Sequence, residues 1–151
     1  GLDDSQLDLI GSCTTTRTLS FNEVIFAENS TSSELYIIAE GEVEIQIDPA
    51  LVSDPSEGSS VPATIATLRR GQCFGEIALV DQGIRSASAV SASPQTELVV
   101  LPREKLMTIC EQHPDLGFAL MRNLAEDLAL KIRSTDLRLR EHLLYGSRRN
   151  R

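Results

Sequence analysis

The chain has 151 residues, 41% of them hydrophobic and 24% charged, and a formal net charge of −8. These values are typical of one globular domain that is large enough to bury a core, and they exclude a chain that is disordered throughout. No apolar run approaches the ~18 residues that a membrane-spanning helix needs, and the N-terminus has aspartates where a secretory signal has basic and apolar residues. We therefore expect a cytoplasmic protein.

The cysteines and histidines give no sign of a metal site or a disulfide framework. Cys13, Cys73 and Cys110 are odd in number and lack close pair spacing, and His113 and His142 lie too far apart to share a metal. No nucleophile lies in a recognisable catalytic motif. We expect no metal and no catalytic residue, and we predict that the chain is not an enzyme.

Charge is distributed unevenly along the chain. Residues 131–151 contain seven of the 14 basic residues and only two of the 22 acidic ones. The acidic remainder repels phosphate backbones, so we expect no nucleic-acid binding by this chain alone. The basic residues 147–151 are interpreted as a solvated tail, and no membrane binding by this chain alone is expected.

The periodicity of hydrophobic residues predicts mainly β structure. A short helix is predicted over residues 2–10, ending near Gly11. Residues 49–63 are rich in turn formers and are interpreted as a mobile hairpin tip. Alternating and β-branched runs predict strands at 14–21, 23–28, 35–39, 42–47, 64–68, 86–90 and 97–101. About eight short strands with polar outer faces predict an eight-stranded antiparallel jelly-roll barrel.

The pattern then changes to helix. Residues 103–112 predict a short helix, and a long helix begins at Pro114. Its apolar residues recur by four from Leu116 and by seven from Leu130. Two such stripes need two surfaces, so we expect one on the barrel and the other on the same helix of a second chain, in a parallel homodimer. The alternative is that both stripes pack on their own chain. The predicted organisation is a β-barrel nucleotide-binding domain at 1–113, a dimerisation and signalling helix at 114–146, and the tail at 147–151.

Residues 71–89 have a pattern that indicates a binding site. A glycine turn precedes one predicted helical turn, whose free backbone N–H groups favour an anion. Arg85 is predicted at the start of the next strand, where its guanidinium can face the same anion. A carboxylate beside a phosphate is unfavourable unless it has another role. Accepting a hydrogen bond from a ribose hydroxyl would be such a role for Glu76. The pattern therefore predicts a nucleotide site. The alternative is that Gly75 only makes a turn, Glu76 is solvated and Arg85 pairs with an acid such as Asp81.

The same segment resembles the phosphate-binding cassette of the cyclic-nucleotide-binding domain family, which includes the ligand domains of catabolite-activator-type regulators and kinase regulatory subunits. The matching residues are Phe74-Gly75-Glu76-Ile77-Ala78-Leu79 and Arg85-Ser86-Ala87, with Leu35 to Val43 similar to the preceding strand and glycine turn. The resemblance implies a regulatory module that binds cyclic AMP or cyclic GMP, with cyclic AMP favoured, and that uses no cofactor.

The resemblance also implies residue roles. Glu76 holds the ribose 2′-hydroxyl and Arg85 the cyclic phosphate, and the cradle is completed by Phe74, Gly75, Ile77, Ala78, Ser86 and Ala87. Where catabolite-activator-type regulators have a Thr-Ser pair that reads adenine, this chain has Lys131-Ile132. The candidate base contacts are therefore Lys131, Ile132 and, at the base edge, Ser134 or Thr135.

Occupancy of such a site is expected to move the long helix through a hinge near residues 103–115. Two alternatives stay open. One is a structural or interaction module on the same fold that binds no nucleotide, and the other is the sensor part of a longer transcription regulator or transporter.

Overall fold

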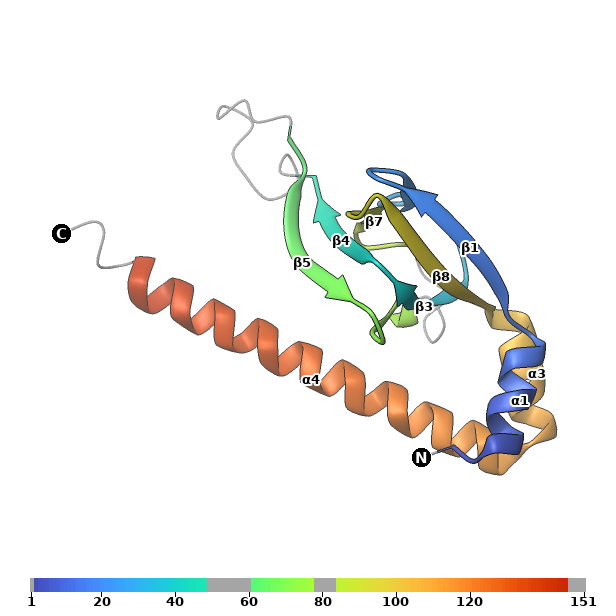
Figure 1. Ribbon diagram of the computed structural model, residues 1–151. Helices are drawn as coiled ribbons and strands as arrows, with labels where there is room; N and C mark the ends of the chain where they lie inside the picture. Colours follow the sequence, from blue (N-terminus) through green and yellow to red (C-terminus); the bar gives the residue numbers. More distant parts are fainter. Residues whose placement is uncertain (1, 49–60, 78–83, 147–151) are drawn as a thin grey trace.

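The computed structural model describes residues 2–48, 61–77 and 84–146. Its described strands are β1 (Thr15–Ser20), β2 (Val24–Phe26), β3 (Glu34–Glu40), β4 (Glu42–Ile47), β5 (Ala63–Arg69), β6 (Cys73–Phe74), β7 (Ser88–Ser91) and β8 (Gln95–Pro102). They form two four-stranded antiparallel sheets, with the order β1-β8-β3-β6 in the first and β2-β7-β4-β5 in the second (Figure 1). Every strand that the sequence predicts is present, and β6 is an additional one.

The predicted class is confirmed, and the predicted jelly-roll barrel is confirmed only in part, because in the described part of the chain the two sheets are not closed into a barrel. There, no strand of one sheet pairs with a strand of the other. The physical reason lies at the edges: β2 has three residues and β6 has two, too few to extend a hydrogen-bonded ladder from sheet to sheet. The fold is therefore two antiparallel sheets with flanking helices.

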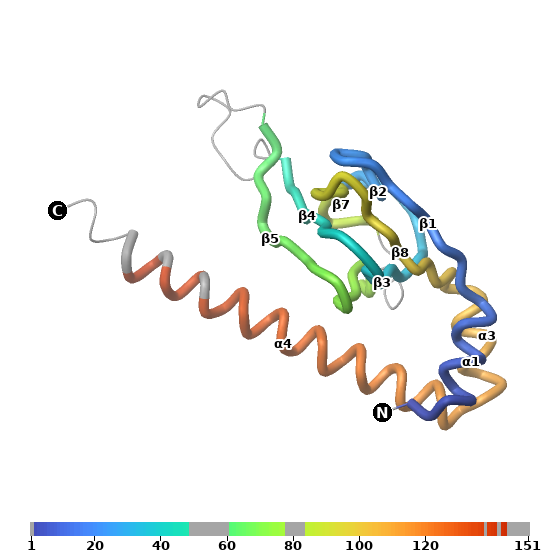
Figure 2. Tube along the Cα trace, in the orientation of Figure 1, coloured from blue at the N-terminus to red at the C-terminus, as the bar shows by residue number. Residues whose placement is uncertain are grey.

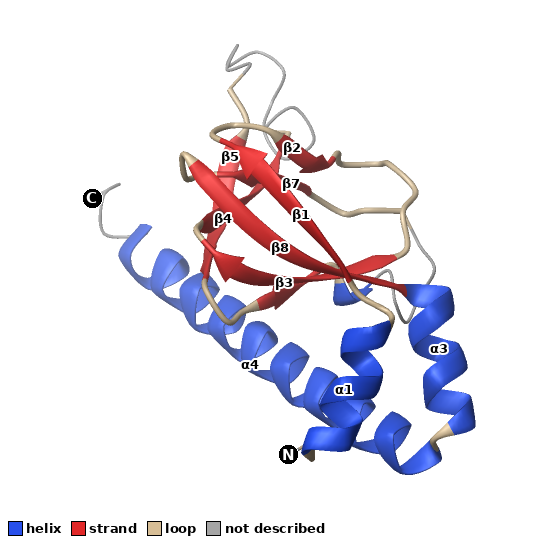
Figure 3. Ribbon diagram, turned by 45° about the vertical axis from the view of Figure 1, so that its right-hand side comes forward, coloured by secondary structure: helices blue, strands red, loops and turns tan. Residues whose placement is uncertain are grey.

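The described helices are α1 (Asp4–Ser12), α3 (Arg103–Gln112) and α4 (Pro114–Gly146). Helices α1 and α3 and the start of α4 lie together at one end of the two sheets, and the rest of α4 continues past them (Figure 3). Helix α1 begins later than predicted because Asp3 caps it: its carboxylate accepts from the Gln6 N–H at 2.9 Å, and the Gln6 side chain accepts from the Asp3 N–H at 3.0 Å. The predicted bounds of α3 and the start of α4 are confirmed, since Pro114 needs no N–H partner in a first turn.

Alternation along the strands creates two apolar surfaces. Tyr36 and Ile38 of β3 face inward, whereas Leu35 and Ile37 face outward onto the helices. The inner cluster draws on both sheets and consists of Leu19, Ile25, Tyr36, Ile38, Val43, Leu68, Phe74, Ala89, Leu98 and Val100. The outer cluster joins the first sheet to α3 and α4 and is centred on Leu35, Leu101, Leu106 and Leu124.

Helix α4 is docked near its start and exposed further along. Leu116 and Leu124 are buried, but Leu130, Ile132, Leu137, Leu139, Leu143 and Leu144 are each more than half exposed. The Cα trace in Figure 2 shows the helix running continuously from its corner with α1 and α3 past the sheets. Within the described residues, no helix is long and apolar enough to cross a membrane.

Three predictions fall on residues outside the described ones. They concern most of the hairpin tip (49–60), most of the cassette turn (78–80) and the basic tail (147–151).

Replacement of a core leucine tests the two-sheet core. Leu98→Ala removes a fully buried side chain between the sheets, so we expect the free energy of unfolding to fall by about 2–5 kcal/mol. The matched control is Leu7→Ala on α1, where the leucine is half exposed and the expected loss is below about 1 kcal/mol. Urea denaturation measures both, and equal losses would contradict this placement of the core.

Candidate functional site

The glycine turn after β6 is built around a close backbone approach. Gly75 has φ +82°, which disfavours any residue with a Cβ. A Cβ here would lie 2.7 Å from Arg85 Nη1 and 2.9 Å from the Glu34 carbonyl oxygen. Phe74, directly before the turn, is buried and stacks on Tyr36 with ring centroids 5.1 Å apart. The core therefore anchors the turn, and the Phe74 side chain belongs to that core.

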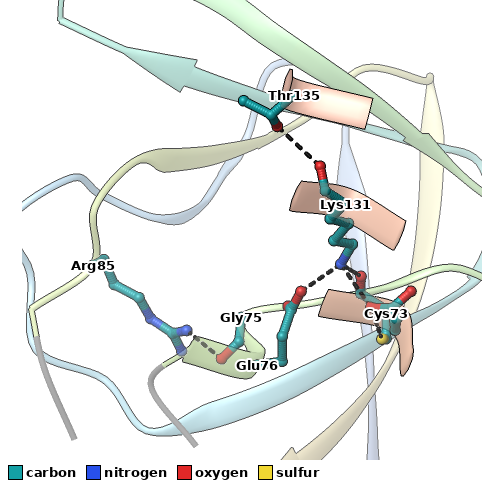
Figure 4. A network of polar contacts seen from close by, with 7 residues as sticks. Cys73, Gly75, Glu76, Arg85, Lys131 and Thr135 are labelled. Carbon is teal, nitrogen blue, oxygen red and sulfur yellow. Dashed lines mark hydrogen bonds and ion pairs between the residues drawn. The ribbon is translucent and has the colours of Figure 1, made fainter. Parts of the chain in front are cut away.

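Arg85 fills the space that Gly75 leaves. Its side chain is only 4% exposed. Nη1 donates to the Gly75 carbonyl at 3.0 Å (Figure 4). Nη2 donates to the Glu34 carbonyl at 2.8 Å, and Nε donates to Ser32 Oγ at 2.8 Å. The guanidinium carbon also lies 4.2 Å from the centre of the Phe26 ring. Two neutral carbonyls, a hydroxyl and an aromatic face thus fix its direction.

The predicted strand position of Arg85 is wrong, because β7 begins only at Ser88. Backbone pairing holds Arg85 instead: its N–H donates to the Ser30 carbonyl at 2.9 Å, and its carbonyl accepts from the Asn29 N–H at 2.8 Å. The segment before β7 is therefore tied to the loop between β2 and β3.

The charge of Arg85 is desolvated, and among the described residues, which do not include the alternative partner Asp81, no carboxylate pairs with it. Burial lowers its pKa, and the nearby Tyr36, Glu34 and Glu76 offset this only in part. Since an arginine stays protonated even so, a buried cation held by neutral dipoles is well suited to bind an anion.

Glu76 is buried, at 5% exposure, so the alternative of a solvated side chain is wrong. Its Oε1 pairs with Lys131 Nζ of α4 at 2.5 Å (Figure 4). The same ammonium donates to the Cys73 carbonyl at 2.8 Å and pairs with Asp127 Oδ2 at 3.0 Å. The long helix is therefore joined to β6 and to the start of the cassette through one lysine.

The charges in this network are mutually stabilised. Burial alone would lower the pKa of Lys131, but the hydrogen bond and charge of Glu76, followed by those of Asp127, raise it above its ordinary value. Burial, reinforced by the charge of Asp127, raises the pKa of Cys73 to about 11. The Cys73 thiol, 3.4 Å from Asp127 Oδ2, is therefore neutral at physiological pH and a poor nucleophile.

The remaining predicted cradle residues lie around the turn. Ile77 and Ser86 are exposed and Ala87 is half-buried, whereas Ala78 lies outside the described residues. The structure thus brings Arg85 against Gly75, with Glu76 next to it in the chain.

The candidate base contacts on α4 differ in their exposure and in their hydrogen-bond partners. Ile132 is exposed, and the hydroxyl of Thr135, also exposed, donates to the Lys131 carbonyl at 2.9 Å. Lys131, expected beside a base, points at Glu76. Asp127 is a partner that sequence reasoning missed, although its i, i+4 spacing from Lys131 was a usable signal.

Together, the two-sheet fold, the buried Arg85 at a glycine turn and the buried Glu76 define a β domain with a buried cation and a buried carboxylate at the same turn. Residues 16–113 match the cyclic nucleotide-binding domain family, and the chain belongs to this family.

Individual relatives agree with this assignment. The "Cyclic AMP receptor protein" of Thermus thermophilus is 32% identical over 151 residues, which are 100% of this chain and 63% of that protein. The human "cGMP-dependent protein kinase 2" is 29% identical over 103 residues, 68% of this chain and 13% of that protein. The crystal structure of the Thermus thermophilus Catabolite Activator Protein superposes with a TM-score of 0.72 and 32% identity, over 92% of this chain and 59% of that one. The chain thus spans less than two thirds of the length of these relatives.

Two glycine substitutions separate backbone strain from the close approach at the site. Gly71 has φ +86° with nothing within 4 Å of an added Cβ, whereas Gly75 has φ +82° and meets Arg85 and Glu34. We expect Gly75→Ala to lower the free energy of unfolding by about 1–3 kcal/mol more than Gly71→Ala does. Urea denaturation of both variants measures the difference. Equal losses would show that the close approach of Arg85 to Gly75 does not contribute to the free energy of unfolding.

Proposed function

We propose that the chain is a regulatory domain that binds a cyclic nucleotide, with cyclic AMP favoured over cyclic GMP, and converts occupancy into a change in the position of α4. The observation that carries the proposal is the buried guanidinium of Arg85, whose hydrogen-bond partners among the described residues are all neutral and which lies against the turn that precedes the buried Glu76. Family membership gives the ligand class. Two relatives, one a cyclic AMP receptor and one a cGMP-dependent kinase, support both ligands.

In this proposal each group has one task. Arg85 binds the cyclic phosphate, because its remaining N–H donors match phosphate oxygens. Glu76 accepts a hydrogen bond from the ribose 2′-hydroxyl. The backbone around Gly75, Ile77, Ala78, Ser86 and Ala87 completes the cradle, and the base lies toward α4, near Ile132 and Thr135. The domain regulates and does not react with its ligand, and its three free cysteines fit a reducing cytoplasm.

We also propose that α4 pairs with α4 of a second copy. Its second apolar stripe is exposed over several turns: Leu130, Leu137 and Leu144 recur every seven residues and are each at least 60% exposed. A seven-residue repeat of leucines is the pattern by which helices pair in coiled coils. Because the relatives are longer, the domain in this proposal serves as the sensor of a longer regulator.

A second candidate function is an interaction module that binds no nucleotide. The observation that favours it is that Glu76 and Arg85 already have protein partners, Lys131 in one case and the Gly75 and Glu34 carbonyls in the other. Such a module would use the same exposed stripe of α4 and would not respond to cyclic nucleotides.

Calorimetry with cyclic AMP, cyclic GMP and 5′-AMP tests the nucleotide site. We expect the two cyclic nucleotides to bind, and Arg85→Ala to weaken binding by about 30- to 150-fold through loss of ~2–3 kcal/mol of charge-assisted contact. Arg85→Lys keeps a charge for the case that the alanine variant folds poorly, and it should weaken binding less. Arg122→Ala, an exposed arginine paired with Glu126 on α4, is the matched control and should bind as the wild type does.

The result is decisive in either direction. Unchanged affinity in the folded Arg85 variants would contradict the site. If neither cyclic nucleotide binds the wild type, the interaction module becomes the better account.

Analytical ultracentrifugation tests the dimer. We expect the wild type to sediment as a dimer and Leu137→Asp to weaken dimerisation by at least about tenfold, because a charge enters the apolar stripe. Leu7→Asp on α1, another exposed leucine, is the control and should leave the dimer unchanged. A wild type that sediments as a monomer at all concentrations would contradict the pairing of α4.

A further inference from the structure

Glu76, the carboxylate assigned to the ribose, is held by the protein's own long helix. Lys131 Nζ lies 2.5 Å from Glu76 Oε1 and also donates to the Cys73 carbonyl in β6. Asp127, one turn earlier on α4, accepts from the same ammonium and contacts the Cys73 thiol. Two consecutive turns of α4 thus bind the strand that leads into the cassette.

These contacts lie where the docking of α4 changes. Before them, Leu120, Met121 and Leu124 pack into the outer core cluster. From Leu130 onward, most apolar side chains are exposed, Ile132 among them. Polar contacts of Asp127 and Lys131 therefore hold α4 against β6 at the point where apolar packing gives way to exposed side chains. A change at Lys131 therefore lies next to the half of the helix whose apolar side chains are exposed.

We propose that Lys131 is a latch that competes with the ligand: its ion pair with Glu76 keeps α4 against β6, and a ribose hydroxyl that takes over Glu76 releases the helix. This inference rests on the proposed function. It adds a regulatory residue to the proposed site. Lys131, which stands where catabolite-activator-type regulators have the first residue of the Thr-Ser pair, then opposes ligand binding instead of recognising the base.

When a ribose hydroxyl replaces Lys131 at Glu76, both charged side chains keep a partner. An ammonium is a stronger partner for a buried carboxylate than a hydroxyl is, so the pair opposes the ligand. When released, Lys131 keeps Asp127 as an i, i+4 partner and is already one third exposed, so its charge is not left buried and alone. Part of the binding energy of the nucleotide is thereby used to free α4, and by linkage anything that frees α4 tightens nucleotide binding.

The first test measures the cyclic AMP affinity of a variant that lacks the Lys131 ammonium. Lys131→Met keeps the length and apolar stem of the side chain, and we expect it to bind cyclic AMP about tenfold more tightly than the wild type, equivalent to ~1.4 kcal/mol. Arg133→Met is the matched control: it removes the same charge from an exposed position two residues further along α4. A basic helix attracts an anionic ligand, so the loss of any positive charge on it weakens binding by itself. Arg133→Met measures this general effect.

The second test needs no nucleotide. Cys73 lies under the latch, so the rate at which iodoacetamide alkylates it, followed by peptide mass spectrometry, reports whether α4 covers β6. Lys131 helps to lower the pKa of Cys73, so its loss alone makes the thiol less reactive. Release of the helix acts in the opposite direction, by exposing the thiol. We expect alkylation of Cys73 to be at least about threefold faster in Lys131→Met than in Arg133→Met, with Cys13 and Cys110 unchanged as internal references.

The outcomes distinguish a failure of the proposed latch from a failure of the proposed function. Tighter cyclic AMP binding together with faster alkylation of Cys73 supports the latch. If the wild type binds cyclic AMP but Lys131→Met binds equally or more weakly, or if alkylation of Cys73 is not faster, the latch is overturned and the proposed function stands. If neither protein binds a cyclic nucleotide, the proposed function fails, and this role of Lys131 fails with it.

Discussion

Arg85 precedes β7 of the second sheet, yet its guanidinium donates to backbone carbonyls of the first sheet, at Glu34 in β3 and at Gly75 after β6. These bonds join the two sheets at the candidate site. Because both acceptors are neutral, they orient the charge without neutralising it. Only glycine at position 75 leaves room for the approach. The turn, the aromatic side chains beneath it and the anion-attracting charge therefore form one structural unit, and the position of Glu76 follows from it.

Helix α4 relates this unit to the rest of the chain in three successive parts. Leu116 to Leu124 are fixed by apolar packing, Asp127 and Lys131 by polar contacts to β6, and the leucines from 130 onward are exposed. Apolar packing is insensitive to a bound anion or hydroxyl, whereas an ion pair with Glu76 is directly sensitive to one. The polar part is therefore the place where events at the cassette can alter the helix.

Much of this was predictable from local sequence, since local rules determine it. The end of α3 before Pro114, the alternation in β4 and the spacing of Gly75, Glu76 and Arg85 all follow from short-range patterns. β6 was missed because two residues carry no periodicity. The Lys131–Glu76 pair joins positions 55 residues apart, and the carbonyl partners of Arg85 are backbone groups that no sequence pattern marks. Sheet closure likewise depends on tertiary pairing at the edges.

The two ends of the proposed site differ in what a ligand has to displace. At Arg85 a phosphate meets a guanidinium with five N–H donors, and its neutral carbonyl partners compete only weakly with an anion. At Glu76 a hydroxyl competes with a full positive charge that is hydrogen-bonded to β6 as well. In the proposed mechanism the phosphate end therefore anchors the ligand, and the sugar end displaces Lys131 and so acts on α4. A phosphate-bearing ligand without a hydroxyl near Glu76 would bind at Arg85 yet have no means of displacing Lys131, so in this site binding and signalling depend on different groups of the same ligand.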